Sequence, residues 1–466
     1  MAHGRAVFAQ YMVGTVTEAH AHQDIDDAVA MGLDGFALNI GDPTQPYVRN
    51  TLNYMFDYTR NNYAGRLWLY FSLDIWASGN AGRGIYPTND YHALLQEFKD
   101  HAAYYKGPNG HSFISTFGDG RLTNDHWRAF RREYGNALYF VPDFDRTQGY
   151  YDAHPGWWAY WEDVIDGAFS WEAAWPIPGR YGGAFPGDIA PDKTVIAGTA
   201  AHGKSYMMAI SALLYRNVYN SNVYRGGELN LPTRMAGILS MSPAPDYIQV
   251  ISWNDGPGSH YIGNLWPEQN TDAQPSIYAT QKTAAHDAWR PLIASFIQAF
   301  KAGLPATSMT PPSNLPVGTL WYKSILQRII CPDERLGGYY SKPDGFETAK
   351  DQLNWAIVVP AGATGYSVRA ISNFKVIQTQ KLVPGLNFGA ADRNVEAGVQ
   401  KLELLLNGKV VQVAKDGRCI TDTCPDGIYN MNPQVVGLTT GSVDGFCLIS
   451  MDFQDVESSD DEYVFV

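Results

Sequence analysis

Acidic, amide and aromatic residues follow most of the short apolar runs that precede Leu304. If each run is a strand, the strand ends carry Tyr11, Asn39, Asp74, Asp119, Asp143, Asp145, Trp171, Glu172, Trp253, Asn254, Asp255, His260 and Tyr261. Cleavage of a glycosidic bond needs two carboxyl groups, because one protonates the leaving oxygen and the other activates water or attacks the anomeric carbon. Tyrosine and tryptophan rings stack on sugar faces while their polar edges stay wet. The pattern therefore favours carbohydrate hydrolysis, with the acids as reacting groups and the amides and rings as sugar contacts.

Each of these residues also has a purely structural interpretation. An aspartate just after a strand is often a helix N-cap, and Asp143 follows Pro142 and could simply turn the chain. Asp74 precedes an apolar Ile-Trp pair and is harder to dismiss in this way. His20 and His22 lie two residues apart with no evident third ligand, so we expect no metal site there.

One motif points to different chemistry. The segment Gly198–Ser205 matches the phosphate-loop pattern G-x-x-x-x-G-K-[ST]. A nucleotide site would also require an apolar strand ending in a metal-binding aspartate within one open sheet. Because the match falls at the seventh of eight apolar runs, we interpret it as the loop after the seventh strand. A phosphate-handling enzyme that uses Lys204 remains the alternative. Ser170 has no GxSxG context, so an esterase is unsupported.

The elements that must position these residues alternate between short apolar runs and longer amphipathic segments, as in a parallel α/β fold. Eight runs favour a closed (β/α)8 barrel, whose active sites lie at the carboxyl ends of the strands. No GxGxxG motif follows the first run, so a dinucleotide site has no support. The expected strands are Val7–Val13, Gly35–Ile40, Leu67–Ile75, Ser112–Phe117, Ala137–Val141, Gly167–Trp171, Thr194–Gly198 and Tyr247–Trp253.

The texture of the sequence changes after Leu304. Residues 305–316 are rich in proline and serine, and helical periodicity is absent beyond them. We therefore expect a barrel over residues 1–304, a linker over 305–316 and a β-sandwich over 317–466. Asn407-Gly408 is a strong hairpin signal. The expected sandwich strands are Leu353–Val359, Tyr366–Ile371, Lys401–Leu406, Val410–Ala414 and Phe446–Met451.

The composition excludes several partners. The net charge is −13 and no run of Lys or Arg occurs, which argues against a nucleic-acid partner. No apolar stretch reaches the ~18 residues that a membrane span needs. The four cysteines suit an oxidising compartment. We expect Cys419 to pair with Cys424, while Cys331 and Cys447 are able to pair and free thiols stay an alternative. We expect a monomer.

Three ordered motifs resemble glycoside hydrolase family 71. They are Phe36–Gly41, Asp166–Trp171, and Ser252–Asp255 followed by Ser259–Gly263. The family comprises fungal α-1,3-glucanases, also called mutanases. The resemblance implies an enzyme of the glucan endo-1,3-α-glucosidase type that cleaves α-1,3-glucan with inversion, needs no cofactor and is secreted. No signal peptide precedes the first apolar run, which leaves a cytosolic protein or a mature secreted form open.

The sequence departs from the family at one position of its clearest motif. The family reads Trp-Asn-Asp, two further residues, then Glu before Ser-His-Tyr, and the Asp and the Glu are its expected catalytic pair. Here Asp255 matches, but Gly258 stands where the Glu belongs. Glycine can neither donate nor accept a proton. Two hypotheses follow: a hydrolase weakened by Gly258, and a non-catalytic glucan-binding protein on the same scaffold.

Overall fold

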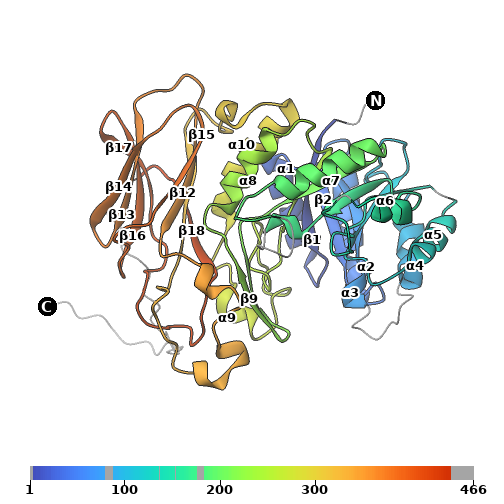
Figure 1. The fold of residues 1–466 in the computed structure, drawn as a ribbon, viewed down its shortest axis with the longest axis horizontal. Coiled ribbons are helices and arrows are strands. Elements are labelled where there is room, and N and C mark those ends of the chain that lie inside the picture. Colours follow the sequence, from blue (N-terminus) through green and yellow to red (C-terminus); the bar gives the residue numbers. More distant parts are fainter. Residues whose placement is uncertain (1–3, 79–87, 136, 153, 176–182, 442–466) are drawn as a thin grey trace, which may run out of the picture.

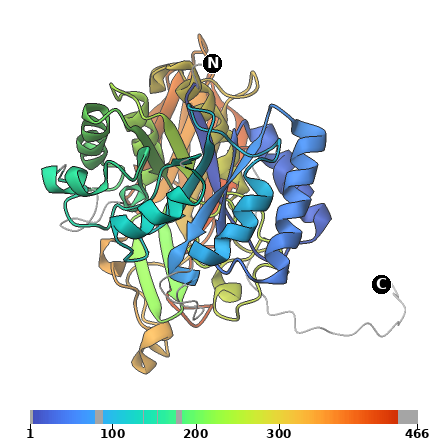
Figure 2. The same ribbon diagram turned by 90° about the vertical axis from the view of Figure 1, so that its right-hand side faces the viewer.

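The computed structural model describes residues 4–441 apart from 79–87, 136, 153 and 176–182. Its first part is a barrel of parallel strands with helices outside, and Figures 1 and 2 show it from two directions. The strand order is β5-β4-β3-β2-β1-β10-β7-β6, and a parallel bridge between Asp143 and Phe169 links the two ends of the sheet. The strands are β1 (Ala6–Met12), β2 (Gly35–Ile40), β3 (Trp68–Asp74), β4 (Ser112–Phe117), β5 (Leu138–Phe140), β6 (Gly167–Ser170), β7 (Ser205–Ile210) and β10 (Tyr247–Val250).

Helices connect the strands, and their ends follow ordinary capping chemistry. Thr17 caps the first helix by accepting from the backbone N–H of His20, and Gly32 ends it in the left-handed conformation that glycine tolerates. The helices are α1 (Glu18–Met31), α2 (Pro46–Tyr63), α3 (Ile75–Ser78), α4 (Thr88–Phe98), α5 (Asn124–Arg132), α6 (Pro155–Trp161), α7 (Ala190–Ala201), α8 (Asn230–Leu239), α9 (Pro275–Tyr278) and α10 (Arg290–Ala302). No helix in the described ranges is both long and apolar enough to cross a bilayer.

The barrel interior is filled by side chains. Phe8 contacts the rings of Tyr70 and Tyr105, each with a centroid distance of 4.9 Å. Above this aromatic layer the Tyr70 hydroxyl donates to Gln249 Oε1 at 2.9 Å, and the Gln249 amide donates to Gln10 Oε1 at 2.5 Å. Because the barrel is a packed core, ligands can bind only at its ends.

The expected seventh strand is wrong. Thr194–Gly198 lies inside α7, where Val195 and Ile196 face the core, and the true strand is β7. A five-residue apolar run fits a buried strand and a buried helix turn equally well. The phosphate-loop match therefore runs from the end of a helix into a strand, the reverse of the strand–loop–helix order that cradles phosphate. Lys204 donates its Nζ to the Ile165 carbonyl at 2.7 Å.

Two four-stranded antiparallel sheets follow the barrel, with orders β15-β12-β11-β18 and β14-β13-β16-β17. Asn407 and Gly408 both have positive φ, and they form the expected hairpin. The predicted strand Phe446–Met451 lies outside the described residues. The strands are β11 (Val317–Lys323), β12 (Leu353–Val359), β13 (Tyr366–Ser372), β14 (Lys375–Lys381), β15 (Gly385–Ala391), β16 (Gln400–Leu406), β17 (Lys409–Ala414) and β18 (Pro433–Gly437).

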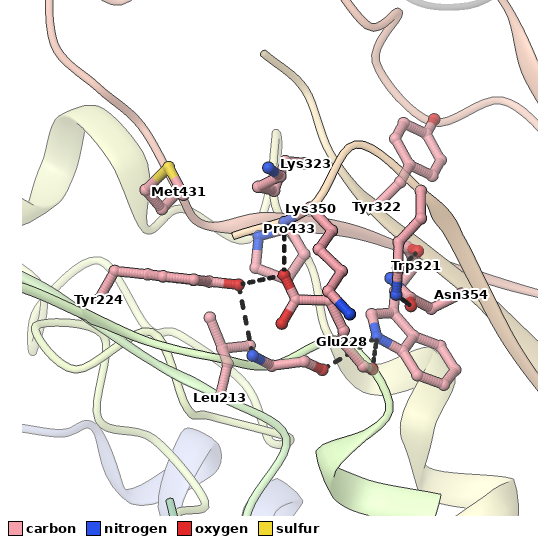
Figure 3. A pocket seen from close by; sticks show the side chains of 12 residues that line it. Leu213, Tyr224, Glu228, Trp321, Tyr322, Lys323, Lys350, Asn354, Met431 and Pro433 are labelled. Atoms are coloured by element: carbon pink, nitrogen blue, oxygen red, sulfur yellow. Dashed lines mark hydrogen bonds between the residues drawn. The ribbon is translucent and has the colours of Figure 1, made fainter. Parts of the chain in front are cut away.

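The barrel and the sandwich share a polar junction (Figure 3). The Trp321 indole donates to the Glu228 carbonyl at 2.8 Å, and the Lys350 backbone N–H donates to the Glu228 carboxylate at 3.0 Å. The Tyr224 hydroxyl donates to the same carboxylate. The cavity between these groups has a volume of about 20 Å³, which is room for a single water. The junction is therefore a joint between the two parts and not a ligand site.

The expected pairing of Cys419 with Cys424 is wrong. Cys424 is bonded to Cys331, which also excludes a Cys331–Cys447 bond, and Cys419 is in a disulfide as well. Cys447 lies outside the described residues. The backbone just after Cys419 pairs with neighbouring chain, since Thr421 donates to the Ser324 carbonyl at 2.9 Å. This pairing places the segment after Cys419 beside the segment that follows Ser324, where Cys424 meets Cys331.

Candidate active site

The loop after β10 carries the acid that the sequence singles out. The Asp255 backbone N–H donates to Ser252 Oγ at 2.9 Å, and the Gly258 backbone N–H donates to Asp255 Oδ1 at 3.0 Å. The second carboxylate oxygen lies 3.4 Å from His260 Nε2. About a fifth of the Asp255 side chain (19%) is exposed. Asp255 is thus held by its own loop and stays partly exposed.

His260 fills the space beside Gly258. A Cβ atom added at Gly258 would lie 2.3 Å from Nε2 and 2.7 Å from Cδ2 of the imidazole, closer than atoms pack. The ring is held by Ser252 Oγ, 3.2 Å from Nδ1, and by Trp175, whose ring centroid is 5.1 Å away. Burial lowers the pKa of His260, although Asp255 acts in the opposite direction. The imidazole is therefore neutral at pH 7, and it stands where a side chain at position 258 would begin.

Asp74, at the end of β3, is the second acid at this place. Its Oδ1 accepts the Ala77 backbone N–H at 2.9 Å. Burial raises the pKa of Asp74 to about 6, and the negative charge of Asp255 adds to the rise. The Asn39 amide and the Arg216 guanidinium favour the charged form and limit the shift. Asp74 therefore lies within electrostatic reach of Asp255 and exchanges its proton near neutral pH.

Arg216 was missed by the sequence reasoning. It lies on β8 (Leu214–Val218), which pairs with β9 (Ser221–Arg225) in a hairpin after β7. Among the described residues its guanidinium makes no hydrogen bond or ion pair, and its Nε is buried without a partner. Its charge nevertheless acts on the pKa of both Asp74 and His260. The predicted site included only residues near the ends of expected strands, so a hairpin between the seventh and eighth expected strands was not considered.

A second acidic group follows β5 and β6. Asp143 accepts the Gly118 backbone N–H at 3.1 Å, and Asp145 accepts the Glu172 backbone N–H at 2.6 Å. Glu172 itself bonds two guanidinium groups: Arg146 Nε at 2.9 Å, and Arg225 at 2.5 Å. The acids that the sequence placed at these strand ends therefore do meet in the structure.

The three acids differ in charge state. Burial raises the pKa of Asp143 well above its usual range, and the neighbouring Asp145 adds to the rise. Burial and the charge of Glu172 raise the pKa of Asp145 to about 6. Burial would also raise the pKa of Glu172, but Arg225 and Arg146 outweigh it and the pKa is lowered. Glu172 is thus a fixed, neutralised carboxylate and a poor donor of protons.

Asp119 and Trp171 lie near this group. Asp119 accepts the Arg121 backbone N–H at 3.1 Å, and burial raises its pKa while Arg146 opposes the rise. The Trp171 ring packs edge-on against Phe117 at 4.7 Å and lies 6.4 Å from the ring of His260. Trp171 therefore links the two acidic groups across the mouth, although its side chain is almost wholly buried.

Four expected sugar contacts point elsewhere. The Tyr11 hydroxyl donates to Asp24 at 3.1 Å, and the Trp253 indole donates to the same carboxylate at 2.9 Å. Tyr261 is fully buried and stacks on a histidine ring. Asn254 bonds both backbone groups of Met12. Successive strand side chains point to opposite faces, so being near a strand end does not place a side chain in the mouth.

The histidines near the start of α1 are engaged with aromatic rings. His20 stacks on Trp266 with a centroid distance of 3.7 Å, and His22 stacks on Tyr58 at 3.8 Å. In the part of the chain that the structure describes, no group of three or more His, Cys, Asp or Glu is arranged to hold a metal ion.

Comparison with known proteins decides the family. The model of glycosyl hydrolase family 71 matches residues 3–446. The chain belongs to this family. It is 29% identical over 452 residues to a mutanase of Penicillium rubens, covering 93% of this chain and 89% of that protein. It is 26% identical to a glucan endo-1,3-alpha-glucosidase of Schizosaccharomyces pombe, covering 82% of this chain and 84% of that one.

A third relative is the ascus wall endo-1,3-alpha-glucanase of the same yeast, 24% identical over 87% of this chain and 91% of that protein. Family membership makes Gly258, three residues after Asp255, the position of most interest. In this family 71 chain the acid at the end of β10 is present, and the position three residues later has no side chain. His260 packs into the space instead.

Proposed function

We propose that the barrel mouth binds α-1,3-glucan, and that this chain hydrolyses it orders of magnitude more slowly than the same chain with Glu at position 258. Membership of family 71 and the names of its relatives support the substrate. One observation supports the slow hydrolysis: position 258, three residues after Asp255, is a glycine, and His260 occupies the space of its side chain. Non-catalytic glucan binding is the limiting case of this proposal.

The mechanistic argument rests on the division of labour in an inverting hydrolase. An acid protonates the leaving oxygen while a base about 6.5–9.5 Å away activates water. Asp255 supplies one of these groups, and no carboxylate stands at Gly258 to supply the other. Removing a general acid or base typically costs ~10²–10⁴ in rate, because water must then transfer the proton. Binding suffers less, since contacts with sugar hydroxyls do not depend on position 258.

The neighbouring acids do not replace the missing group equally well. Glu172 is neutralised by Arg146 and Arg225 and holds no proton at neutral pH. Asp74 is the acid near Asp255 with a pKa of about 6. We therefore expect any residual hydrolysis to depend on Asp74 and Asp255.

The test compares binding and turnover in three chains. Titration calorimetry with an α-1,3-gluco-oligosaccharide measures binding by the native chain, Gly258→Glu and Gly258→Ala. Release of reducing sugar from α-1,3-glucan measures turnover. We expect all three to bind and only Gly258→Glu to gain activity, by ~10²-fold or more. The alanine chain is the matched control, because it displaces His260 without adding a carboxylate.

Two results contradict the proposal. Absence of oligosaccharide binding by the native chain would remove the substrate assignment. Native turnover equal to that of Gly258→Glu would show that position 258 does not limit the reaction, and Asp74 would then be the first candidate for the partner of Asp255.

We further propose that the protein is secreted and monomeric, with a barrel over residues 1–304, a linker over 305–316 and an accessory sandwich over 317–466. The Cys331–Cys424 disulfide is of a kind that persists in oxidising compartments. The relative named for the ascus wall supports an extracellular setting. Detection in culture medium and light scattering test the location and the oligomeric state.

A further inference from the structure

An exposed aromatic residue lies at the tip of the β8–β9 hairpin. Val218 pairs with Ser221, so Tyr219 and Asn220 form a two-residue turn. Both have left-handed backbones, with φ of 54° and 58°. Such turns favour glycine and asparagine, and a bulky residue is disfavoured there. Tyr219 is nevertheless present and 57% exposed. A residue that local structure disfavours invites a functional explanation.

The Tyr219 ring is fixed in orientation. Its hydroxyl donates to a carboxylate oxygen of Asp272, and the Arg216 guanidinium lies 5.4 Å from its centroid. These contacts come from the loop after β10 and from the hairpin itself. A ring that is held at its edge and backed by a cation, and still more than half exposed, is suited to stacking on a flat ligand.

The ring borders an open cleft of about 500 Å³. Three separate segments line it: the hairpin turn, residues 272–274, and Gly338 with Tyr339 from the C-terminal part. Amide side chains are frequent among the lining residues, including Asn220, Asn222 and Gln274. Asn222 Oδ1 is buried without a hydrogen-bond partner in the described structure. Amides beside an aromatic ring are the groups that bind sugar hydroxyls and sugar faces.

Hydrogen bonds tie the hairpin beside the cleft to the loop that carries Asp255. The Asn217 backbone N–H donates to the Tyr278 hydroxyl at 3.3 Å, and that hydroxyl donates to the Pro257 carbonyl at 3.0 Å. Arg216, which backs the Tyr219 ring, also acts electrostatically on Asp74. Burial and the Asp272 carboxylate raise the pKa of Tyr219, and the charge of Asp255 adds to the rise, so the ring lies within electrostatic reach of Asp255.

We propose that Tyr219 is the stacking platform of a distal glucosyl subsite, formed with Asn220, Asn222 and Gln274, for residues of the α-1,3-glucan chain beyond those held at Asp255. The inference rests on the proposed function. Its ligand is a further stretch of the same polysaccharide, so its contribution grows with the length of the oligosaccharide.

The test is calorimetric titration of the native chain and Tyr219→Gly with α-1,3-linked trisaccharide and hexasaccharide. Glycine suits the left-handed backbone, so this change should leave the fold intact, as thermal unfolding will check. We expect hexasaccharide binding to weaken by ~10-fold, the size of one lost stacking contact, and trisaccharide binding to stay within ~2-fold.

Phe374→Gly is the matched control. Phe374 is also an exposed aromatic residue with positive φ in a two-residue hairpin turn, but it lies on the sandwich between β13 and β14. It should leave both affinities unchanged. Equal hexasaccharide affinity in the native and Tyr219→Gly chains would overturn the subsite while the proposed function stands. A native chain that binds neither oligosaccharide would overturn the proposed function itself.

Discussion

The close packing of His260 on Gly258 predicts a measurable coupling between the two residues. Gly258 does not have the left-handed backbone that requires glycine. Replacement of glycine by alanine at such a position normally stabilises a protein by about 0.4–1 kcal/mol. Here the added Cβ would lie 2.3 Å from His260 Nε2, so the imidazole must move. Overpacking of this kind typically costs about 1–3 kcal/mol.

These opposing effects define a double-mutant cycle. In the native background we expect Gly258→Ala to lower the free energy of unfolding by about 1–3 kcal/mol. In a His260→Ala background the clash is absent, and the same change should raise it by about 0.4–1 kcal/mol. The difference gives a coupling of about 1.5–4 kcal/mol. Urea unfolding of the four chains, followed by tryptophan fluorescence, measures it.

A coupling below about 0.5 kcal/mol, the usual level of additivity, would refute this account of His260. It would mean that the imidazole does not occupy the space at position 258. Gly258→Glu would then need no rearrangement, and the alanine control in the turnover experiment would lose its purpose.

Three further predictions concern stability. The pKa of Asp74 is raised from 3.8 to about 6, so the folded state prefers its protonated form. Stability should fall by up to ~3 kcal/mol as the pH rises from about 4 to above 6. Asp74→Asn should remove most of that dependence in urea unfolding at pH 4 and 7.5. Cys331→Ser should destabilise by about 2–5 kcal/mol, and peptide mapping without reductant should link the Cys331 and Cys424 peptides; a map that links other cysteines would contradict the structure. Arg234 and Asp192 form a fully buried ion pair at 3.0 Å, so Arg234→Met should cost about 3–5 kcal/mol in thermal or chemical unfolding, and a loss below 1 kcal/mol would count against it.

Much of the fold follows from hydrophobic patterning, and its one large error has a physical cause. Seven of the expected barrel strands overlap observed ones, because buried parallel strands are continuous apolar runs. The run Thr194–Gly198 has the same character but belongs to a helix with little amphipathic contrast. The true strand, Ser205–Ile210, begins within the phosphate-loop match and was overlooked for that reason.

The candidate site was predictable in its acids and less so in its other groups. Asp74, Asp143, Glu172 and Asp255 follow strands, and the fold brings them to one end of the barrel. The direction of a side chain could not be predicted from its place after a strand. Tyr11 was expected to line the mouth, but it points to Asp24. Disulfide connectivity is likewise a long-range property, because only the folded chain decides which cysteines meet.

The junction between barrel and sandwich limits how this protein can be recombined. A binding module that is exchanged freely among enzymes shares little surface with its neighbour. Here the Asn432 side chain donates to the Tyr278 carbonyl at 2.7 Å, and the cleft beside Tyr219 is completed by Gly338 and Tyr339. A graft of this barrel onto another module, or its production alone, would remove one wall of the cleft proposed to bind glucan. The barrel and the sandwich must therefore be kept together when the protein is transferred or redesigned.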